Sequence, residues 1–170
     1  MKQLPEKIAL DKAVHGQRHY QGNVELKQLS RLTDMLAGAG GLVEFSIQFE
    51  RAAGILGKAQ VKVKADLPLI CTISANEFMF PVDIDSTIGF IDDLAYEDLL
   101  DVDMEASWVK EGMINPLEII EDELILAVPD APFDESQGHI DETETADNED
   151  LKQGKLSTKK NPFSVLENLK

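Results

Sequence analysis

The chain of 170 residues is 43% hydrophobic and carries a formal net charge of -16 at pH 7. This length and composition suffice for one hydrophobic core, which the long polar stretch after Pro129 confines to about the first 130 residues. A negative field of this size repels phosphate backbones over about 10 Å at moderate salt and argues against broad, nonspecific binding of RNA or DNA.

The charge is distributed unevenly along the chain. Residues 1–76 have a net charge of +3, residues 77–150 of -23, and residues 151–170 of +4. The acidic part attracts basic proteins, whereas the two basic parts leave a local contact with RNA open. The simplest alternative is that the acidity only maintains solubility.

Cys71 is the only cysteine, which excludes an intramolecular disulfide and an all-cysteine metal site. The N-terminal residues lack the apolar core of a signal peptide, and no segment approaches the roughly 20 apolar residues that span a bilayer. We therefore expect a cytoplasmic protein without a membrane partner.

The first predicted element is a helix at about residues 25–37. Four leucines recur there at helical spacing, and the glycine-rich residues 38–41 end the pattern. The apolar positions are Leu26, Leu29, Leu32 and Leu36.

Two strands follow, because apolar and polar residues alternate in residues 43–50 and again in residues 58–67. The short link between them contains two glycines and predicts an antiparallel hairpin. We expect Lys58, Lys62 and Lys64 to pair with glutamates on the neighbouring strand, at about 0.2–1 kcal/mol per pair. Contact with nucleic acid is the alternative.

Further strands are predicted at residues 69–74, 78–84 and 106–109. They complete an α+β fold built on an antiparallel β meander or a partly open barrel with packed helices. The acidic residues 92–105 fit a short helix or an ordered loop, and we expect Trp108 to lie in the core.

The clearest local prediction is a helix around residues 117–128. Asn115 can cap it, Pro116 suits its first turn, and Pro129 ends it. The apolar residues share one face of this helix. On the opposite, outer face we expect three acidic residues that are candidate partner-binding groups: Glu118, Glu121 and Asp122.

Residues 131–160 are predicted to form a disordered acidic linker, because large apolar groups are almost absent from them. The terminal residues 161–170 repeat apolar side chains at helical spacing, but such a peptide folds only on a partner or on its own domain. We interpret it as a short partner-binding motif with the residues Asn161, Pro162, Phe163, Val165, Leu166 and Leu169.

No catalytic pattern is recognisable. His15 and His19 are four residues apart, but Gly16 disfavours a helix there and further metal ligands are missing. The acidic clusters lack the spacing of a calcium-binding loop, and the glycines of residues 38–41 follow a helix where nucleotide-binding loops follow a strand. We expect a protein that is not an enzyme and has no cofactor and no small-molecule substrate.

Two separated segments resemble the YceD family of bacterial proteins, which is named for accumulation of the large-subunit ribosomal RNA. They are Glu-Asp-Glu-Leu-Ile-Leu-Ala-Val-Pro at residues 121–129, followed by Pro132, and Asn-Pro-Phe-Ser-Val-Leu-Glu-Asn-Leu-Lys at residues 161–170. The resemblance implies a non-enzymatic ribosome biogenesis factor that supports synthesis, processing or stability of 23S ribosomal RNA.

The resemblance also draws attention to Cys71. Many members of the family carry a Cys-x-x-Cys pair at this strand, whereas Ser74 takes the second position here. This departure puts a metal or redox role of the pair in doubt, and we expect Cys71 to serve as a small buried hydrophobe.

Two hypotheses for the molecular role follow. In the first, a basic ribosomal protein or large-subunit assembly factor binds the acidic surface and the terminal motif. In the second, the protein binds precursor large-subunit rRNA directly. The residues that would carry RNA binding are Arg31, Lys58, Lys62, Lys64, Lys159 and Lys160.

Overall fold

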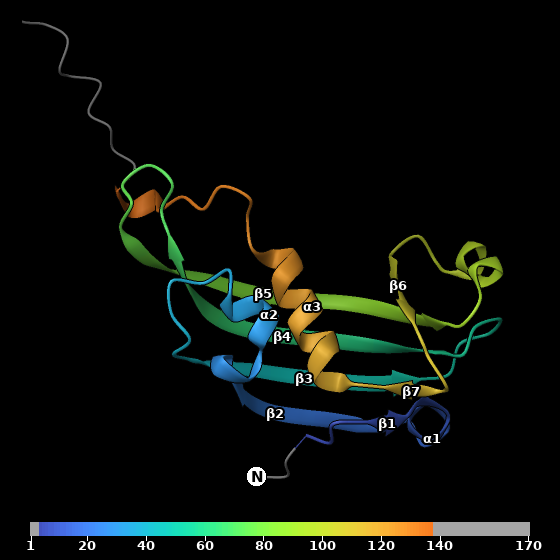
Figure 1. Cartoon of the computed structure of the whole chain (residues 1–170). Coiled ribbons are helices and arrows are strands. Elements are labelled where there is room, and N and C mark those ends of the chain that lie inside the picture. The colour runs from blue at the N-terminus through green and yellow to red at the C-terminus, as the bar shows by residue number, and fades with distance from the viewer. Residues whose placement is uncertain (1–3, 138–170) are drawn as a thin grey trace, which may run out of the picture. The chain divides into compact units, whose positions relative to one another are not determined.

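A mixed five-stranded sheet forms the framework of this computed structural model, which describes residues 4–137 (Figure 1). The strand order is β2-β3-β4-β5-β6. The first four strands run antiparallel to their neighbours, whereas β6 runs parallel to β5. The strands are β2 (His19–Glu25), β3 (Leu42–Glu50), β4 (Gly57–Ile70), β5 (Glu77–Ile91) and β6 (Met104–Trp108).

The remaining elements are short, apart from one helix. A second sheet pairs two strands of two residues each. None of the helices in residues 4–137 has the length and apolar composition needed to cross a membrane. These elements are β1 (Ile8–Ala9), α1 (Leu10–His15), α2 (Ser30–Thr33), β7 (Met113–Ile114) and α3 (Pro116–Ala127), with 3-10 helices at Leu26–Gln28, Leu94–Leu99 and Glu135–Gln137.

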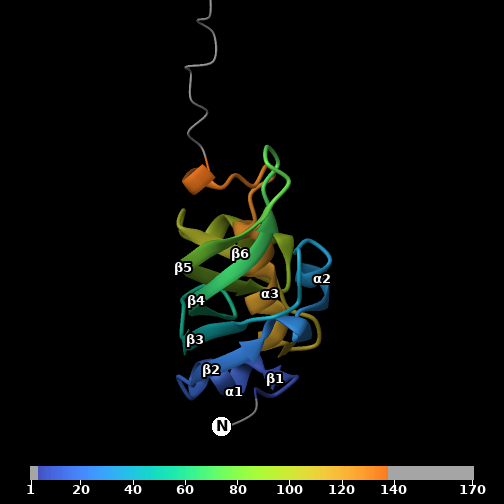
Figure 2. The same ribbon diagram turned by 90° about the vertical axis from the view of Figure 1, so that its left-hand side faces the viewer.

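The core lies between one face of the sheet and the helices α2 and α3, which cover that face (Figures 1 and 2). Alternate residues of β3 and β4 point into it, because successive side chains of a strand face opposite sides. The polar residues between them lie on the opposite face of the sheet. The buried contributors include Val43, Phe45, Ile47, Phe49, Ala59, Val61, Val63, Ile120 and Leu124.

The α+β class and the hairpin of β3 and β4 are confirmed. The antiparallel meander is confirmed for β3 to β5, and β2 extends it, but β6 departs from it, and the sheet of the described residues does not close into a barrel. The separate strand predicted at residues 69–74 is wrong. Strand β4 continues to Ile70, and residues 71–76 turn into β5 through a hydrogen bond of 2.9 Å from Cys71 N to Asn76 O.

The prediction of one helix at residues 25–37 is also wrong, because two short helices take its place. A 3-10 helix ends at Gln28, and α2 begins anew at Ser30, although three leucines of the pattern are fully buried. Strand β2 was not predicted, because it is an edge strand whose side chains are mostly exposed and lack apolar alternation.

Residues 131–137, predicted as the start of the linker, contact the hairpin turn. Thr72 donates two hydrogen bonds to the carbonyl of Pro132, from its amide at 2.8 Å and from its hydroxyl at 3.1 Å. The rest of the predicted linker, residues 138–160, and the terminal motif at residues 161–170 lie outside the described residues.

Gly57 begins β4 where a side chain has no room. Its φ is +149°, and a Cβ atom there would lie 2.5 Å from Cγ2 of the buried Val14. We expect Gly57→Ala to lower the free energy of unfolding by about 1–3 kcal/mol, because the stiff valine must move. Urea denaturation measures this. Gly38→Ala is the control, since no atom lies within 4 Å of its added Cβ, and an equal loss there would contradict the account.

Candidate partner-binding groove

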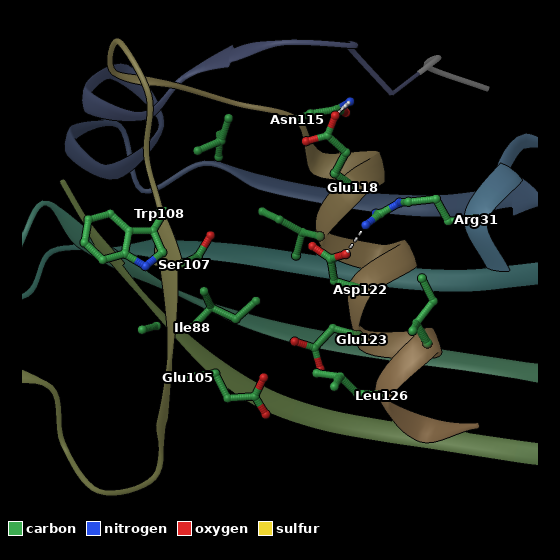
Figure 3. Close-up of a pocket in the computed structure, with 14 residues that line it drawn as sticks. Arg31, Ile88, Glu105, Ser107, Trp108, Asn115, Glu118, Asp122, Glu123 and Leu126 are labelled. Atoms are coloured by element: carbon green, nitrogen blue, oxygen red, sulfur yellow. Dashed lines mark hydrogen bonds and ion pairs between the residues drawn. The ribbon is translucent and has the colours of Figure 1, made fainter. Parts of the chain in front are cut away.

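A groove of about 530 Å³ separates α3 from β6 on the helix-covered face of the sheet (Figure 3). We call it the α3–β6 groove. Among residues 4–137, four carboxylates and one basic side chain, that of Arg31, line it. Apolar side chains complete the walls. The carboxylates belong to Glu105, Glu118, Asp122 and Glu123, and the apolar residues include Ile88, Ile119, Ile125 and Leu126.

Helix α3 begins as the sequence predicts. The Asn115 side chain accepts a hydrogen bond of 3.0 Å from the amide of Leu117 and donates one of 3.1 Å to Glu118. Pro116 occupies the first turn, where its missing N–H costs nothing. Glu118 and Asp122 are four residues apart and therefore lie on the same side of the helix, toward the groove.

Glu121 lies elsewhere than predicted. We expected it on the outer face of α3, but it is 6% exposed. Its Oε1 accepts hydrogen bonds from the amides of Arg31 at 2.7 Å and Leu32 at 3.3 Å. These amides begin α2 and have no acceptor within that helix, so a carboxylate from α3 caps α2. The same bonds explain the break in the predicted helix, because a continuous helix would direct these amides to carbonyls four residues earlier.

Arg31 is bound on two sides. Its Nε and one terminal nitrogen lie 2.9 Å and 2.8 Å from Oε2 of Glu121, and the other terminal nitrogen lies 2.8 Å from Oδ1 of Asp122. The hydrogen bond to Glu121, together with that to Asp122 and the charges of both carboxylates, raises the pKa of Arg31 above its ordinary value. Arg31, a candidate RNA contact, therefore belongs to an intramolecular ion-pair network.

Glu123 is a carboxylate on the buried side of α3, with 6% of its surface exposed. Its Oε2 accepts a hydrogen bond of 2.8 Å from the hydroxyl of Ser86 on β5. Burial raises the pKa of Glu123, and the negative charges of Glu105 and Asp122 raise it further. Negative charges of several carboxylates therefore lie close together in the groove.

The prediction that Trp108 belongs to the core is wrong. It is 50% exposed, and β6 is an edge strand of the five-stranded sheet. Glu105 pairs with Ile88 of β5 and Trp108 pairs with Ile91, so the two side chains of β6 face opposite sides of the sheet. The indole therefore projects away from α3 and from the groove carboxylates (Figure 3).

The lysines of β4 form ion pairs on the polar face of the sheet, as expected. Lys58 lies 3.6 Å from Glu50, Lys62 lies 3.0 Å from Asp85, and Lys64 lies 2.8 Å from Asp83. Only Lys58 has its partner on β3, whereas the other two pair with aspartates of β5. The remaining candidates lie outside the described residues, namely Lys159, Lys160, Asn161, Pro162, Phe163, Val165, Leu166 and Leu169.

Cys71 is buried in the hairpin turn, as predicted. Hydrogen bonds lower its pKa to about 7; the largest contribution comes from the Ser74 side chain and smaller ones from the backbones of Ser74 and Asp134. Ser74 thus contacts the thiol of Cys71. The histidines discussed above lie apart, with His15 in α1 and His19 in β2, where Nε2 of His19 is 2.8 Å from the Ser46 hydroxyl.

The fold and the groove define an acidic α+β protein with an amphipathic groove beside its longest helix. Residues 59–170 match a family model described as large ribosomal RNA subunit accumulation protein YceD, and the chain belongs to this family. No curated protein and no solved structure matches the chain. The matched region includes every residue of the groove lining except Arg31. The family name links these proteins to large-subunit rRNA and names no catalytic activity.

Removing the Glu121 carboxylate tests its role as a cap. We expect Glu121→Ala to lower the free energy of unfolding by about 1–3 kcal/mol, because two backbone amides lose their acceptor. Asp122→Asn is the matched control, since it removes only an exposed contact with the same arginine and should cost less than about 1 kcal/mol. Urea denaturation measures both variants, and an equal loss of stability in the two would contradict the account.

The raised pKa of Glu123 predicts a pH-dependent effect. The folded state binds the proton of this carboxyl more tightly than the unfolded state, so stability is lost as pH rises from the ordinary carboxyl range through the raised pKa. We expect Glu123→Gln to be more stable than the wild type at pH 7, with a difference that shrinks as the pH is lowered.

Thermal unfolding of both proteins between about pH 4 and pH 7 measures this difference. Glu97→Gln makes the same change of net charge at an exposed residue outside the groove and serves as the control. A Glu123→Gln protein that is less stable than the wild type at pH 7 would contradict the sign of the effect.

Proposed function

We propose that the protein supports accumulation of large-subunit rRNA as a non-enzymatic cytoplasmic factor that binds a basic ribosomal protein or large-subunit assembly factor. This proposal rests on how the charged side chains are distributed: carboxylates gather at the groove, whereas the lysines of β4 are already paired. Four carboxylates line the α3–β6 groove with one arginine, which already contacts Glu121 and Asp122. The lysines of β4 each lie within 4 Å of a carboxylate.

This distribution favours a protein partner over RNA. A phosphate that approached Lys62 or Lys64 would have to compete with Asp85 or Asp83 and would meet their negative charge. A basic protein gains from the same acidic groups, both in the rate of encounter and in the choice of partner. The carboxylates at the groove are therefore better placed for recognition than the lysines.

Binding of a basic protein also suggests how rRNA would benefit. Cationic side chains bind phosphate backbones without regard to sequence, and that binding is strong at low salt. An acidic partner that covers these side chains would keep a ribosomal protein from associating with rRNA at the wrong place. We propose that the terminal motif at residues 161–170 adds an apolar contact to the same partner, through side chains such as Phe163 and Leu166.

The proposal predicts a salt-sensitive protein complex. The immobilised full-length chain should retain proteins from an RNA-free extract of large ribosomal subunits at about 50 mM salt and release them at several hundred millimolar salt. A fragment of large-subunit rRNA should not bind at about 50 mM salt.

The double variant Lys62→Gln, Lys64→Gln separates the two molecular roles. Under the proposal it retains as much protein as the wild type. If the wild type retained no ribosomal protein, or bound rRNA in a way that weakened in this variant, direct RNA binding would replace the proposal.

A further inference from the structure

Glu105 and Glu123 face one another across the groove. Glu105 extends from β6 and Glu123 from α3 (Figure 3). Within residues 4–137, the polar contact of Glu123 is the Ser86 hydroxyl, and neither carboxylate forms an ion pair with a lysine or arginine. The nearby Arg31 is held by Glu121 and Asp122.

The apolar part of the groove lies beside this pair of carboxylates. Leu126 on α3 is 72% exposed, and Ile88 of β5 lies on the same side of the sheet as Glu105 (Figure 3). A side chain with a long aliphatic stem and a cationic end matches this combination, because the stem packs on apolar surface while the charge meets the carboxylates.

Building on the proposed function, we propose that the basic protein partner docks in the α3–β6 groove by inserting an arginine or lysine side chain between Glu105 and Glu123, with its stem against Leu126. The cation relieves the repulsion between the two carboxylates. The groove volume of about 530 Å³ suits a few side chains of a protruding segment and is too small for a folded domain.

Other occupants fit the groove less well. Nucleic acid would bring phosphates to the carboxylates, and a second copy of this chain would bring a net charge of -16. Among residues 4–137, no group of three acidic, histidine or cysteine side chains is arranged to hold a metal ion. A cationic segment of another protein therefore matches the groove in charge as well as in apolar surface.

Two single substitutions test the docking, and the probe is the protein retained by the wild-type chain from the RNA-free extract of large subunits. Glu105→Gln removes one carboxylate, and Leu126→Ala removes the exposed apolar wall. Each should weaken binding of the retained protein about tenfold, as measured by titration of the full-length chain.

The matched controls lie on the exposed 3-10 helix outside the groove. Glu97→Gln removes one negative charge and Leu94→Ala truncates one exposed leucine, and neither should change the affinity. Unchanged unfolding midpoints for all four variants ensure that a loss of binding reflects the groove rather than the fold.

A photo-crosslinking amino acid locates the contact independently. Placed at Leu126, it should link to a lysine- or arginine-containing segment of the partner; placed at Met79, an exposed residue of β5 outside the groove, it should give no such link. If the wild type binds the partner but the groove variants bind equally well, or the link forms only at Met79, the docking site is wrong and the proposed function stands. If the wild type binds no large-subunit protein, the proposed function itself fails.

Discussion

The carboxylate of Glu121 holds together the parts of the molecule on which the groove depends. It begins α2 by accepting two backbone hydrogen bonds, and it binds the Arg31 side chain. Arg31 in turn contacts Asp122 at the groove. A buried charge is costly without such partners. The contacts of Glu121 therefore hold α3 against α2, and so fix one wall of the groove.

The charged side chains are distributed differently on the two faces of the five-stranded sheet. On the polar face, lysines of β4 alternate with the core residues and find aspartates across the strand pair. On the helix-covered face, the carboxylates of α3 and β6 gather with little positive charge. Cationic and anionic groups are thus balanced on one side and unbalanced on the other, and the unbalanced side also exposes Leu126 of α3.

Local patterns predicted much of this fold. The cap at Asn115 and the alternation in β3 and β4 depend on neighbours in sequence, and both were recognisable. The parallel pairing of β6 and the exposure of Trp108 depend on which strand ends at the edge of the sheet, which local pattern does not reveal. Glu121 caps a helix about 90 residues earlier in the chain, so its burial could not be inferred from the polarity of α3. The burial of Glu123 could have been predicted, because this residue lies three residues after Ile120 and next to the apolar face of the helix.

The central claim is that the charges of the groove, rather than the lysines of the sheet, connect this protein to large-subunit rRNA. The most direct measurement is the amount of mature large-subunit rRNA in cells whose own copy is replaced by variants expressed at equal levels. The account predicts that cells with a double Glu105→Gln, Leu126→Ala variant accumulate as little of this rRNA as cells without the protein, whereas Lys62→Gln, Lys64→Gln restores the wild-type amount. Normal accumulation with the groove variant and a loss with the lysine variant would contradict it.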